Sequence, residues 1–490
     1  MFPVLTKQLE RVPAEAWLIT AGIVLYLASF FVVRFLGFIY AVPLLLILPL
    51  IGWYLFQSVI KPVLILIPML GTIYLGDIVK IIPDGVVPLT LFQILLLLSL
   101  VIYLFHHLVH ERQRFRTMGF ELELLLILTL ISLSIIYSPN RESALINFSR
   151  ILFLILSAYL IINVIRKQSH FYATFFLLTL ITVVLGFLSF RNALLNPVIE
   201  VLNIRAGGAR IFGRGAITIE DPNVFASLFF LPIAFITSAF FSKIRLQWRF
   251  YALITGLLLV AGLASTYSRS AWIATAFMLL MMVIYYRQYK LMFLLAATVV
   301  VTILSIPELR SMTFNIINRL MDIFAGTDDD SSRIRVLLGI AAVRMFFDSW
   351  FMGVGFRGFP ERFTDYFSTQ ESIGVVEPHN ITYEILAELG IVGFGLIVFL
   401  AYRIFRMASA NIRKSVTEPD KIIATSLIAS LAAYIVFFQF YGGALVSTNL
   451  WAIIGLVIAH SYYLDYYGKK PLQDIPVTDS GTVGTGSSLK

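Results

Sequence analysis

Runs of about 20 apolar residues recur along most of the chain, and charged residues, proline or glycine bound each run. A helix needs roughly that length to cross the hydrocarbon layer of a bilayer, where few charged side chains are tolerated. With 59% hydrophobic and 13% charged residues among 490, a soluble core could not bury so much apolar surface. The sequence therefore predicts an all-α polytopic membrane protein.

Fourteen such runs can be drawn, and we expect 12–14 transmembrane helices. The runs cover residues 15–33, 38–56, 61–77, 89–108, 121–137, 143–164, 171–190, 222–241, 250–266, 271–286, 291–306, 380–402, 421–440 and 446–464. No small-residue cleavage site follows the first run, so we interpret it as a retained helix and not as a signal peptide.

The runs divide the chain into five expected parts. These are N-terminal transmembrane helices over 1–190, further helices with a Gly/Arg-rich loop over 191–306, a large extracytoplasmic loop containing helices over 307–379, C-terminal transmembrane helices over 380–466, and a cytoplasmic tail over 467–490. Because the tail is rich in Gly, Ser and Thr, we expect it to be disordered.

Basic residues mark alternate connections between the apolar runs, around 112–116, 166–167, 243–249, 287–290 and 403–421. The excess of Lys and Arg on the cytoplasmic side of membrane proteins assigns these connections and both termini to the cytoplasm. The opposite side then carries short turns and two long segments, 191–221 and 307–379. The basic residues form no stripe along one face, so nucleic acid is not an expected partner.

The 37 basic residues divide unevenly between the two predicted sides, because fifteen arginines but a single lysine, Lys80, fall on the extracytoplasmic side. Guanidinium binds phosphate or carboxylate through two parallel hydrogen bonds, which ammonium cannot do. The bias therefore favours an anionic ligand such as a lipid diphosphate. The alternative is that these arginines pair with carboxylates of the same loops and stabilise the fold. With no cysteine and six histidines, we expect neither a metal nor a cofactor.

Two segments have the composition of an anion site. The loop 205–214 contains three arginines among glycines, and Asp221-Pro222 after it predicts a helix start with Asp as N-cap. Backbone amides at a Gly-rich loop and a helix N-terminus suit an anion, although such a loop can also be a simple turn. Arg269 lies between two apolar runs, where an arginine is costly unless it has a partner. The alternative is that its side chain extends to the phosphates of the lipid headgroups.

The segment 307–379 contains one clear helix signal. Asp328–Ser332 predicts a helix start, and a helix is expected over about 333–347. Its apolar face would comprise Ile334, Leu337, Leu338, Ala341 and Met345. Arg333 and Arg344 would lie along one edge of that face, so the helix could lie on the membrane surface and direct arginines inward. Solvated arginines are the alternative.

The last polar cluster begins the run that starts near residue 380. Pro378 predicts the helix start and places His379 in the first turn, where a helix N-terminus disfavours the charged imidazole. A neutral histidine there could accept a proton. Glu384 and Glu388 lie one turn apart deeper in the same helix and need partners, for which arginines of the bundle are expected.

The order of these motifs resembles that of the O-antigen ligase/polymerase superfamily over residues 205–400. After the Gly/Arg-rich loop come Asp221-Pro222-Asn223, Ser268-Arg269-Ser270-Ala271-Trp272, Ser332-Arg333-Ile334, Met345-Phe346-Phe347-Asp348, Gly353-Val354-Gly355, His379-Asn380, and Leu386-Ala387-Glu388-Leu389-Gly390 with Gly393. The first six expected helices carry no recognised motif.

The resemblance implies a GT-C-like, metal-independent, inverting glycosyltransferase of the bacterial cytoplasmic membrane, with its active site on the extracytoplasmic face. The donor would be a glycan on undecaprenyl diphosphate, gripped by Arg269 and by Arg214 or Arg210, of which Arg214 is preferred. His379 would be the base or the group that orients the acceptor, and Arg333 a further phosphate ligand. The expected supporting residues are Asn380, Glu388, Asp221 and Tyr383.

Two acceptors are compatible with this resemblance. A polymerase passes the glycan to the next lipid-linked unit, whereas an O-antigen ligase passes it to lipid A core; the chain length and the fourteen expected spans favour the polymerase slightly. Membrane lipids, a chain-length regulator and flippase proteins are the other expected partners. A lipid-linked oligosaccharide flippase is the alternative from a different class, although the sequence shows neither repeated halves nor charges at midplane depth.

Overall fold

The computed structural model describes residues 53–54, 57–58, 61–73, 90–109, 115–195, 221–290, 314, 330–367 and 377–467. This part of the chain is helical and contains no β-strand, which confirms the all-α class. The helices are η1 (Pro62–Ile65), α4 (Leu66–Ile73), α5 (Leu91–Val109), α6 (Glu121–Tyr137), α7 (Arg141–Val164), α8 (Gln168–Leu195), α9 (Pro222–Ser227), α10 (Phe230–Phe241), α11 (Leu246–Ser265), α12 (Arg269–Tyr286), α15 (Asp330–Asp348), α16 (Phe359–Phe363), α18 (Ile381–Lys414), α19 (Glu418–Phe438), η3 (Ala444–Val446) and α20 (Thr448–Tyr467).

Eight of the described helical segments are long and apolar enough to cross a membrane. The spans expected at 15–33 and 291–306, and nearly all of 38–56, lie outside the described residues. A total of fourteen spans, the full extent of the segment 307–379 and the disorder of the tail therefore stay predictions.

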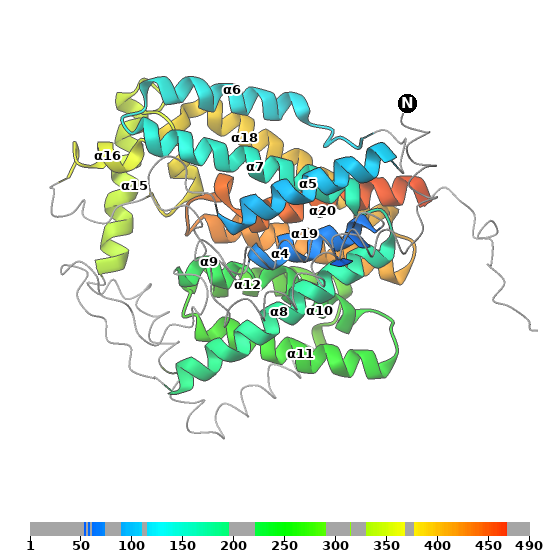
Figure 1. Ribbon diagram of the computed structural model, residues 1–490. Coiled ribbons are helices and arrows are strands. Elements are labelled where there is room, and N and C mark those ends of the chain that lie inside the picture. The colour runs from blue at the N-terminus through cyan, green and yellow to red at the C-terminus, as the bar shows by residue number, and fades with distance from the viewer. Residues whose placement is uncertain are drawn as a thin grey trace, which may run out of the picture.

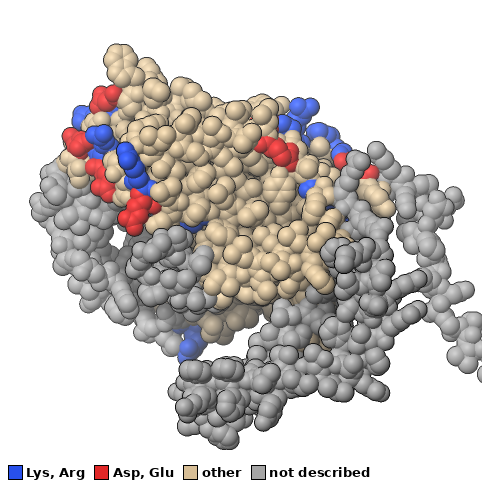
Figure 2. Space-filling view, turned by 45° about the horizontal axis from the view of Figure 1, so that its top comes forward, with Lys and Arg blue, Asp and Glu red and all other residues tan. Residues whose placement is uncertain are grey.

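The long helices run side by side as one bundle, and α15 crosses the ends of the helices at one end of it (Figure 1). Helix α8 packs on α11, α12 packs on α19, and α7 packs on α20. Charged side chains gather at the two ends of the bundle, with an uncharged band between them (Figure 2). Large apolar side chains such as Leu133 and Phe176, 55% and 65% exposed, lie on the outer surface of these helices, as a bilayer requires.

At each end of the bundle, polar contacts join connections that the sequence assigns to the same side of the membrane. At one end, which we call the basic-loop end, the connections 115–120, 165–168, 242–245 and 415–417 meet. There Gln168 donates to Asp420 (2.7 Å), and Lys414 pairs with Asp465 (2.6 Å). At the opposite end, which we call the site end, the hydroxyl of Ser138 donates to the carbonyl of Phe356 (2.9 Å). The alternation of sides along the described chain is thus as the sequence predicts.

Several helix limits differ from the expected ones. Helix α18 continues to Lys414, twelve residues beyond the predicted end at 402, because polar residues can extend a helix past the hydrocarbon layer. Helix α15 begins at Asp330, three residues before the predicted start. The span expected over 222–241 is divided into α9 and α10 by a turn at residues 228–229.

Helix α18 is interrupted near the site end at Gly390, whose φ of 66° lies in the left-handed region. The amide of Ile391 donates to the carbonyl of Phe351 (3.0 Å), while the amide of Val354 donates to the carbonyl of Ala387 (2.8 Å). Residues 351–355, which we call the insertion loop, thus satisfy backbone groups that the interrupted helix leaves open. Such satisfaction is needed for irregular backbone at membrane depth.

The insertion loop and α18 approach each other at backbone contact. A Cβ atom at Gly390 would lie 2.2 Å from the carbonyl oxygen of Phe351, and a Cβ atom at Gly353 would lie 2.5 Å from the carbonyl oxygen of Glu388. Both glycines also have positive φ. The chain that follows the insertion loop, which includes Arg357, is therefore held against the first turns of α18.

Candidate functional site

Those residues singled out by the sequence whose positions the structure describes lie at the site end of the bundle. Five segments contribute: the start of α9, the turn between α11 and α12, the chain after the insertion loop, residues 377–388, and the connection 439–447 between α19 and α20. These segments lie far apart in the sequence, so their meeting is a property of the tertiary fold.

Asp221 and Asn223 connect two of these segments. Asp221 is the N-cap of α9, as predicted: one carboxylate oxygen accepts the amide of Asn223 (2.7 Å), and the other accepts the hydroxyl of Tyr441 (2.8 Å). The side chain of Asn223 in turn accepts the hydroxyl of Ser268 (2.7 Å). The start of α9 thus joins the Arg269 turn to the connection 439–447.

Arg269 lies between α11 and α12, as the apolar runs predict; it is the first residue of α12, and Ser268 is the N-cap. Arg269 is only 7% exposed, so its side chain is enclosed by protein. Tyr267, directly before the cap, has a φ of 52°. A buried guanidinium held at a fixed place is suited to binding an anion.

His379 lies outside α18, contrary to the prediction that it occupies the first turn. The helix begins at Ile381 with Asn380 as N-cap, because the side chain of Asn380 accepts the amide of Tyr383 (3.1 Å). The same side chain donates to the carbonyl of Gln439 (2.8 Å). His379 precedes this cap with a φ of 53°, so its ring is directed by the turn and not by the helix.

The imidazole of His379 is half-buried beside Tyr441, with ring centroids 6.1 Å apart. Burial is the main cause that lowers the pKa of His379, and the charge of Arg335 lowers this pKa further, while Asp221 opposes them. A neutral imidazole is therefore expected near pH 7, as predicted. The main cause of the lowered pKa of His379 is burial and not the helix N-terminus.

Glu384 faces the guanidinium of Arg357, the kind of partner that the sequence led us to expect, and Glu388 binds the backbone amide of the same residue. A terminal guanidinium nitrogen of Arg357 lies 3.9 Å from Glu384 and 3.7 Å from Glu377. The carboxylate of Glu388 accepts the amides of Arg357 (2.8 Å) and Phe359 (3.4 Å). One arginine is thus placed among three carboxyl groups.

The connection 439–447 closes over this cluster. The amide of Gly443 donates to Glu384 (2.8 Å), and a Cβ atom at Gly442 would lie 2.6 Å from a carboxylate oxygen of Glu377. Burial and the charge of Asp221 raise the pKa of Tyr441, so its hydroxyl stays protonated and donates to Asp221. Any side chain at position 442 would collide with the buried carboxylates, so glycine is required there.

Sequence reasoning gave no role to Arg357, Glu377 or Tyr441. In the structure, Arg357 has a φ of 57° and its backbone amide is held by Glu388. The available signal was the three glutamates at 377, 384 and 388 at the start of an apolar run, which require a cation nearby. Which of the many arginines supplies it could not be read from the sequence.

Helix α15 carries the expected apolar face. Leu338, Ala341 and Met345 are buried against α16, and Ile334 and Leu337 are partly buried there. The ring of Tyr383 lies 3.1 Å from the position of a Cβ atom at Gly339, so Tyr383 packs on α15. On the same helix, the charge of Arg335 acts on His379, although Arg333 was the residue selected.

The remaining expected ligands cannot be placed. Arg210, Arg214 and the side chain of Arg333 lie outside the described residues. Within the described ranges, no three His, Asp or Glu side chains are grouped so as to hold a metal ion.

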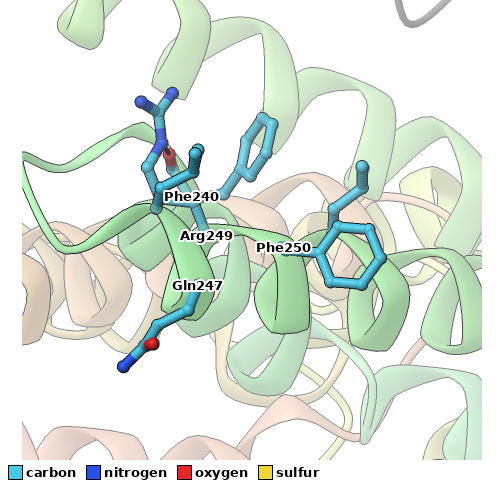
Figure 3. A pocket seen from close by; sticks show the side chains of 6 residues that line it. Phe240, Gln247, Arg249 and Phe250 are labelled. Carbon is cyan, nitrogen blue, oxygen red and sulfur yellow. Dashed lines mark hydrogen bonds between the residues drawn. The ribbon is translucent and has the colours of Figure 1, made fainter.

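A cavity of about 620 Å³ lies away from these residues, at the basic-loop end between α10 and α11 (Figure 3). It is lined by Phe240, Leu246, Gln247, Arg249, Phe250 and Leu253. Its charged member, Arg249, donates to the carbonyl of Phe240 (2.9 Å). An apolar hollow of this kind offers no acid or base for a reaction, so the candidate site is the cluster at the site end.

Residues 254–398 match the family model described as O-antigen ligase. The matched segment includes Arg269, Arg357 and His379, and it confirms the resemblance to the O-antigen ligase/polymerase superfamily. No curated protein matches the chain.

Proposed function

Starting from this match, we propose that the protein is an inverting, metal-independent glycosyltransferase. It transfers a glycan from undecaprenyl diphosphate to an acceptor sugar at the extracytoplasmic face of the cytoplasmic membrane. Polymerisation of surface polysaccharide repeat units is the favoured reaction. The helical bundle and the family match support a membrane enzyme of the O-antigen ligase and polymerase type.

The observation that carries the proposal is the junction at Asp221 and Asn223. Through Tyr441 it reaches the His379 ring, and through Ser268 it reaches the Arg269 turn. An anion receptor and a neutral imidazole are thereby held at the same end of the bundle. Transfer from a lipid diphosphate needs both.

Each group has a defined task in the reaction. A diphosphate is already a good leaving group, and the buried guanidinium of Arg269 stabilises the negative charge that develops as the glycosidic bond breaks. The neutral imidazole of His379 accepts a hydrogen bond from the acceptor hydroxyl and directs it at the anomeric carbon. A single displacement inverts that carbon. Arg214 or Arg210 and Arg333 are proposed as additional diphosphate ligands.

The description of the matching family favours a second acceptor, lipid A core, and hence an O-antigen ligase. Both reactions use the same donor and the same site, and differ only in the acceptor. Chain length and the expected number of spans favour polymerisation, whereas the match favours ligation.

The test uses purified protein in detergent with one lipid-linked repeat unit, with chelator and without nucleotide sugar, and separates the products by size. A ladder of multiples supports a polymerase. Transfer that requires added lipid A core supports a ligase. Unchanged donor in both assays would contradict glycosyl transfer and favour the flippase alternative.

A further inference from the structure

Two carboxyl groups of the site share one cation without a direct hydrogen bond to it. The guanidinium of Arg357 lies 3.7 Å from Glu377 and 3.9 Å from Glu384. Oxygens of both carboxyl groups also approach the same point next to Gly442, at 2.6 and 2.9 Å from the position of a Cβ atom there. One positive charge therefore faces two buried carboxyl groups, and a third, that of Glu388, binds the backbone amide of the same arginine. Three negative charges in this buried cluster would carry a large energetic penalty.

The three carboxyl groups have unequal hydrogen-bond partners. Glu388 accepts two backbone amides and Glu384 accepts the amide of Gly443. Hydrogen bonds from amides favour the charged form of a carboxyl group. The buried oxygen of Glu377 has no hydrogen-bond partner among the described residues. Glu377 is consequently the member of the cluster that binds a proton most readily.

Glu377 also lies near His379, the residue assigned to the acceptor. Residues 441–443 contact both: Tyr441 lies beside the His379 ring, and Gly442 packs against Glu377. The next residue, Gly443, binds Glu384. The charge of Asp221 acts on both His379 and Glu377. The imidazole and the carboxyl group therefore belong to one cluster of contacting residues, separated in sequence by Pro378 alone.

We propose that Glu377 accepts the proton of the acceptor hydroxyl, and that His379 orients this hydroxyl without keeping its proton. The inference rests on the proposed transfer reaction. In the step, the acceptor oxygen forms a bond to the anomeric carbon while the bond from that carbon to the diphosphate oxygen breaks. The electron pair of the broken bond leaves with undecaprenyl diphosphate. The hydroxyl proton ends on the carboxylate of Glu377, so no further reactant is required.

The ionisation of the two groups agrees with this assignment. Burial and the charge of Glu384 raise the pKa of Glu377 to about 8, with a smaller contribution from Asp221, while Arg357 opposes them. Among the described residues, Tyr441, which stays protonated, and Glu388 also interact electrostatically with Glu377. The pKa of His379 is instead lowered. A base works best when its pKa lies near the working pH, which favours the carboxyl group.

The test is the pH dependence of kcat/KM for transfer, from about pH 6 to about pH 10. A base must lose its proton to act, so wild-type activity should rise with pH and level off above about pH 8. In Glu377→Gln we expect a loss of roughly 100-fold or more at the plateau and no rise across that range. Glu377→Asp keeps a carboxyl group and should recover part of the rate together with the rise.

Two further variants separate this role from a structural one. Glu384→Gln removes the neighbouring charge that raises the pKa of Glu377, so the rise should move to lower pH. Glu361→Gln changes an exposed glutamate of α16 and should keep the wild-type profile. A Glu377→Gln protein with the wild-type rate and the wild-type rise would overturn the assignment. A wild-type protein without transfer at any pH would contradict the proposed function itself.

Discussion

Three non-glycine residues around the site have left-handed backbone conformations: Tyr267, Arg357 and His379. Such conformations cost on the order of 1 kcal/mol each and persist when the surrounding contacts determine them. Tyr267 and His379 each precede a helix cap, and Arg357 is fixed by the carboxylate of Glu388. These conformations are therefore located in the segments that form the candidate site.

Arg269 and His379 are expected to be indispensable for transfer. We predict that Arg269→Ala and His379→Ala each lower the rate by at least about 100-fold, because they remove charge stabilisation and acceptor orientation. Arg269→Lys should fail as well, since it keeps the charge but loses the planar pair of donors. The measurement is product formation from the lipid-linked unit.

The matched control for these variants is Arg362→Ala, because Arg362 is an exposed arginine of α16 paired with Asp365. It should retain the wild-type rate. Normal product from His379→Ala or Arg269→Ala, with protein that is folded by its melting profile, would refute the assigned role of that residue.

At the scale of elements, the interrupted helix α18 is the feature that positions the site. Its break at Gly390 is filled by the insertion loop, which brings Arg357 to Glu384 and Glu388 on the same helix. A substitution that disrupts this contact should therefore displace the residues of the site without removing any functional side chain.

Gly390→Ala tests the backbone contact between α18 and the insertion loop. A Cβ atom at this position would collide with Phe351 and occupy positive φ, so we expect a loss of stability on the order of 2 kcal/mol and a lower Tm. Gly395→Ala lies in the same helix with no heavy atom within 4 Å of its Cβ atom. That variant should be neutral or slightly more stable, because alanine favours helix. Equal Tm values for the two variants would contradict the close contact.

The packing of α8 on α11 offers a second test at this scale. A Cβ atom at Gly262 would lie 2.7 Å from the Cα atom of Gly186, whereas one at Gly256 would come no closer than 3.4 Å to Ile236. Gly262→Ala should therefore cost about 1–3 kcal/mol by overpacking, and Gly256→Ala should cost much less. Thermal unfolding in detergent measures both, and the reverse order of stabilities would argue against this helix pair.

At the scale of the whole molecule, the two ends of the bundle differ in what they carry. The basic-loop end collects the Lys-containing connections, and the site end collects the arginines and carboxyl groups of the candidate site. The uncharged band between the ends fits a bilayer (Figure 2). This arrangement agrees with the predicted topology, although the side that faces the cytoplasm is still a prediction.

Because the chain has no cysteine, single cysteines can report its orientation without background. Glu361→Cys at the site end and Val416→Cys at the basic-loop end both replace exposed residues. In spheroplasts, a membrane-impermeant maleimide should label Glu361→Cys directly and Val416→Cys only after the membrane is opened. The opposite labelling pattern would show that the predicted topology is inverted and would exclude the proposed extracytoplasmic site.

The sequence by itself determined the class of protein, the positions of most helices and the segments that carry the site. Apolar runs, basic connections and caps such as Asp221 act over a few residues, so they can be read without the fold. The family resemblance had the same basis, in motifs such as Ser268-Arg269 and His379-Asn380.

Only the tertiary structure decided which of these residues meet. Arg357 contacts Glu377 and Glu384 because the insertion loop fills the break in α18, and Tyr441 reaches Asp221 across 220 residues of sequence. Contacts of this kind depend on how helices pack and on backbone hydrogen bonds between distant segments. No local pattern specifies them, which is why the proton-binding carboxyl group Glu377 emerged from the fold and not from the sequence.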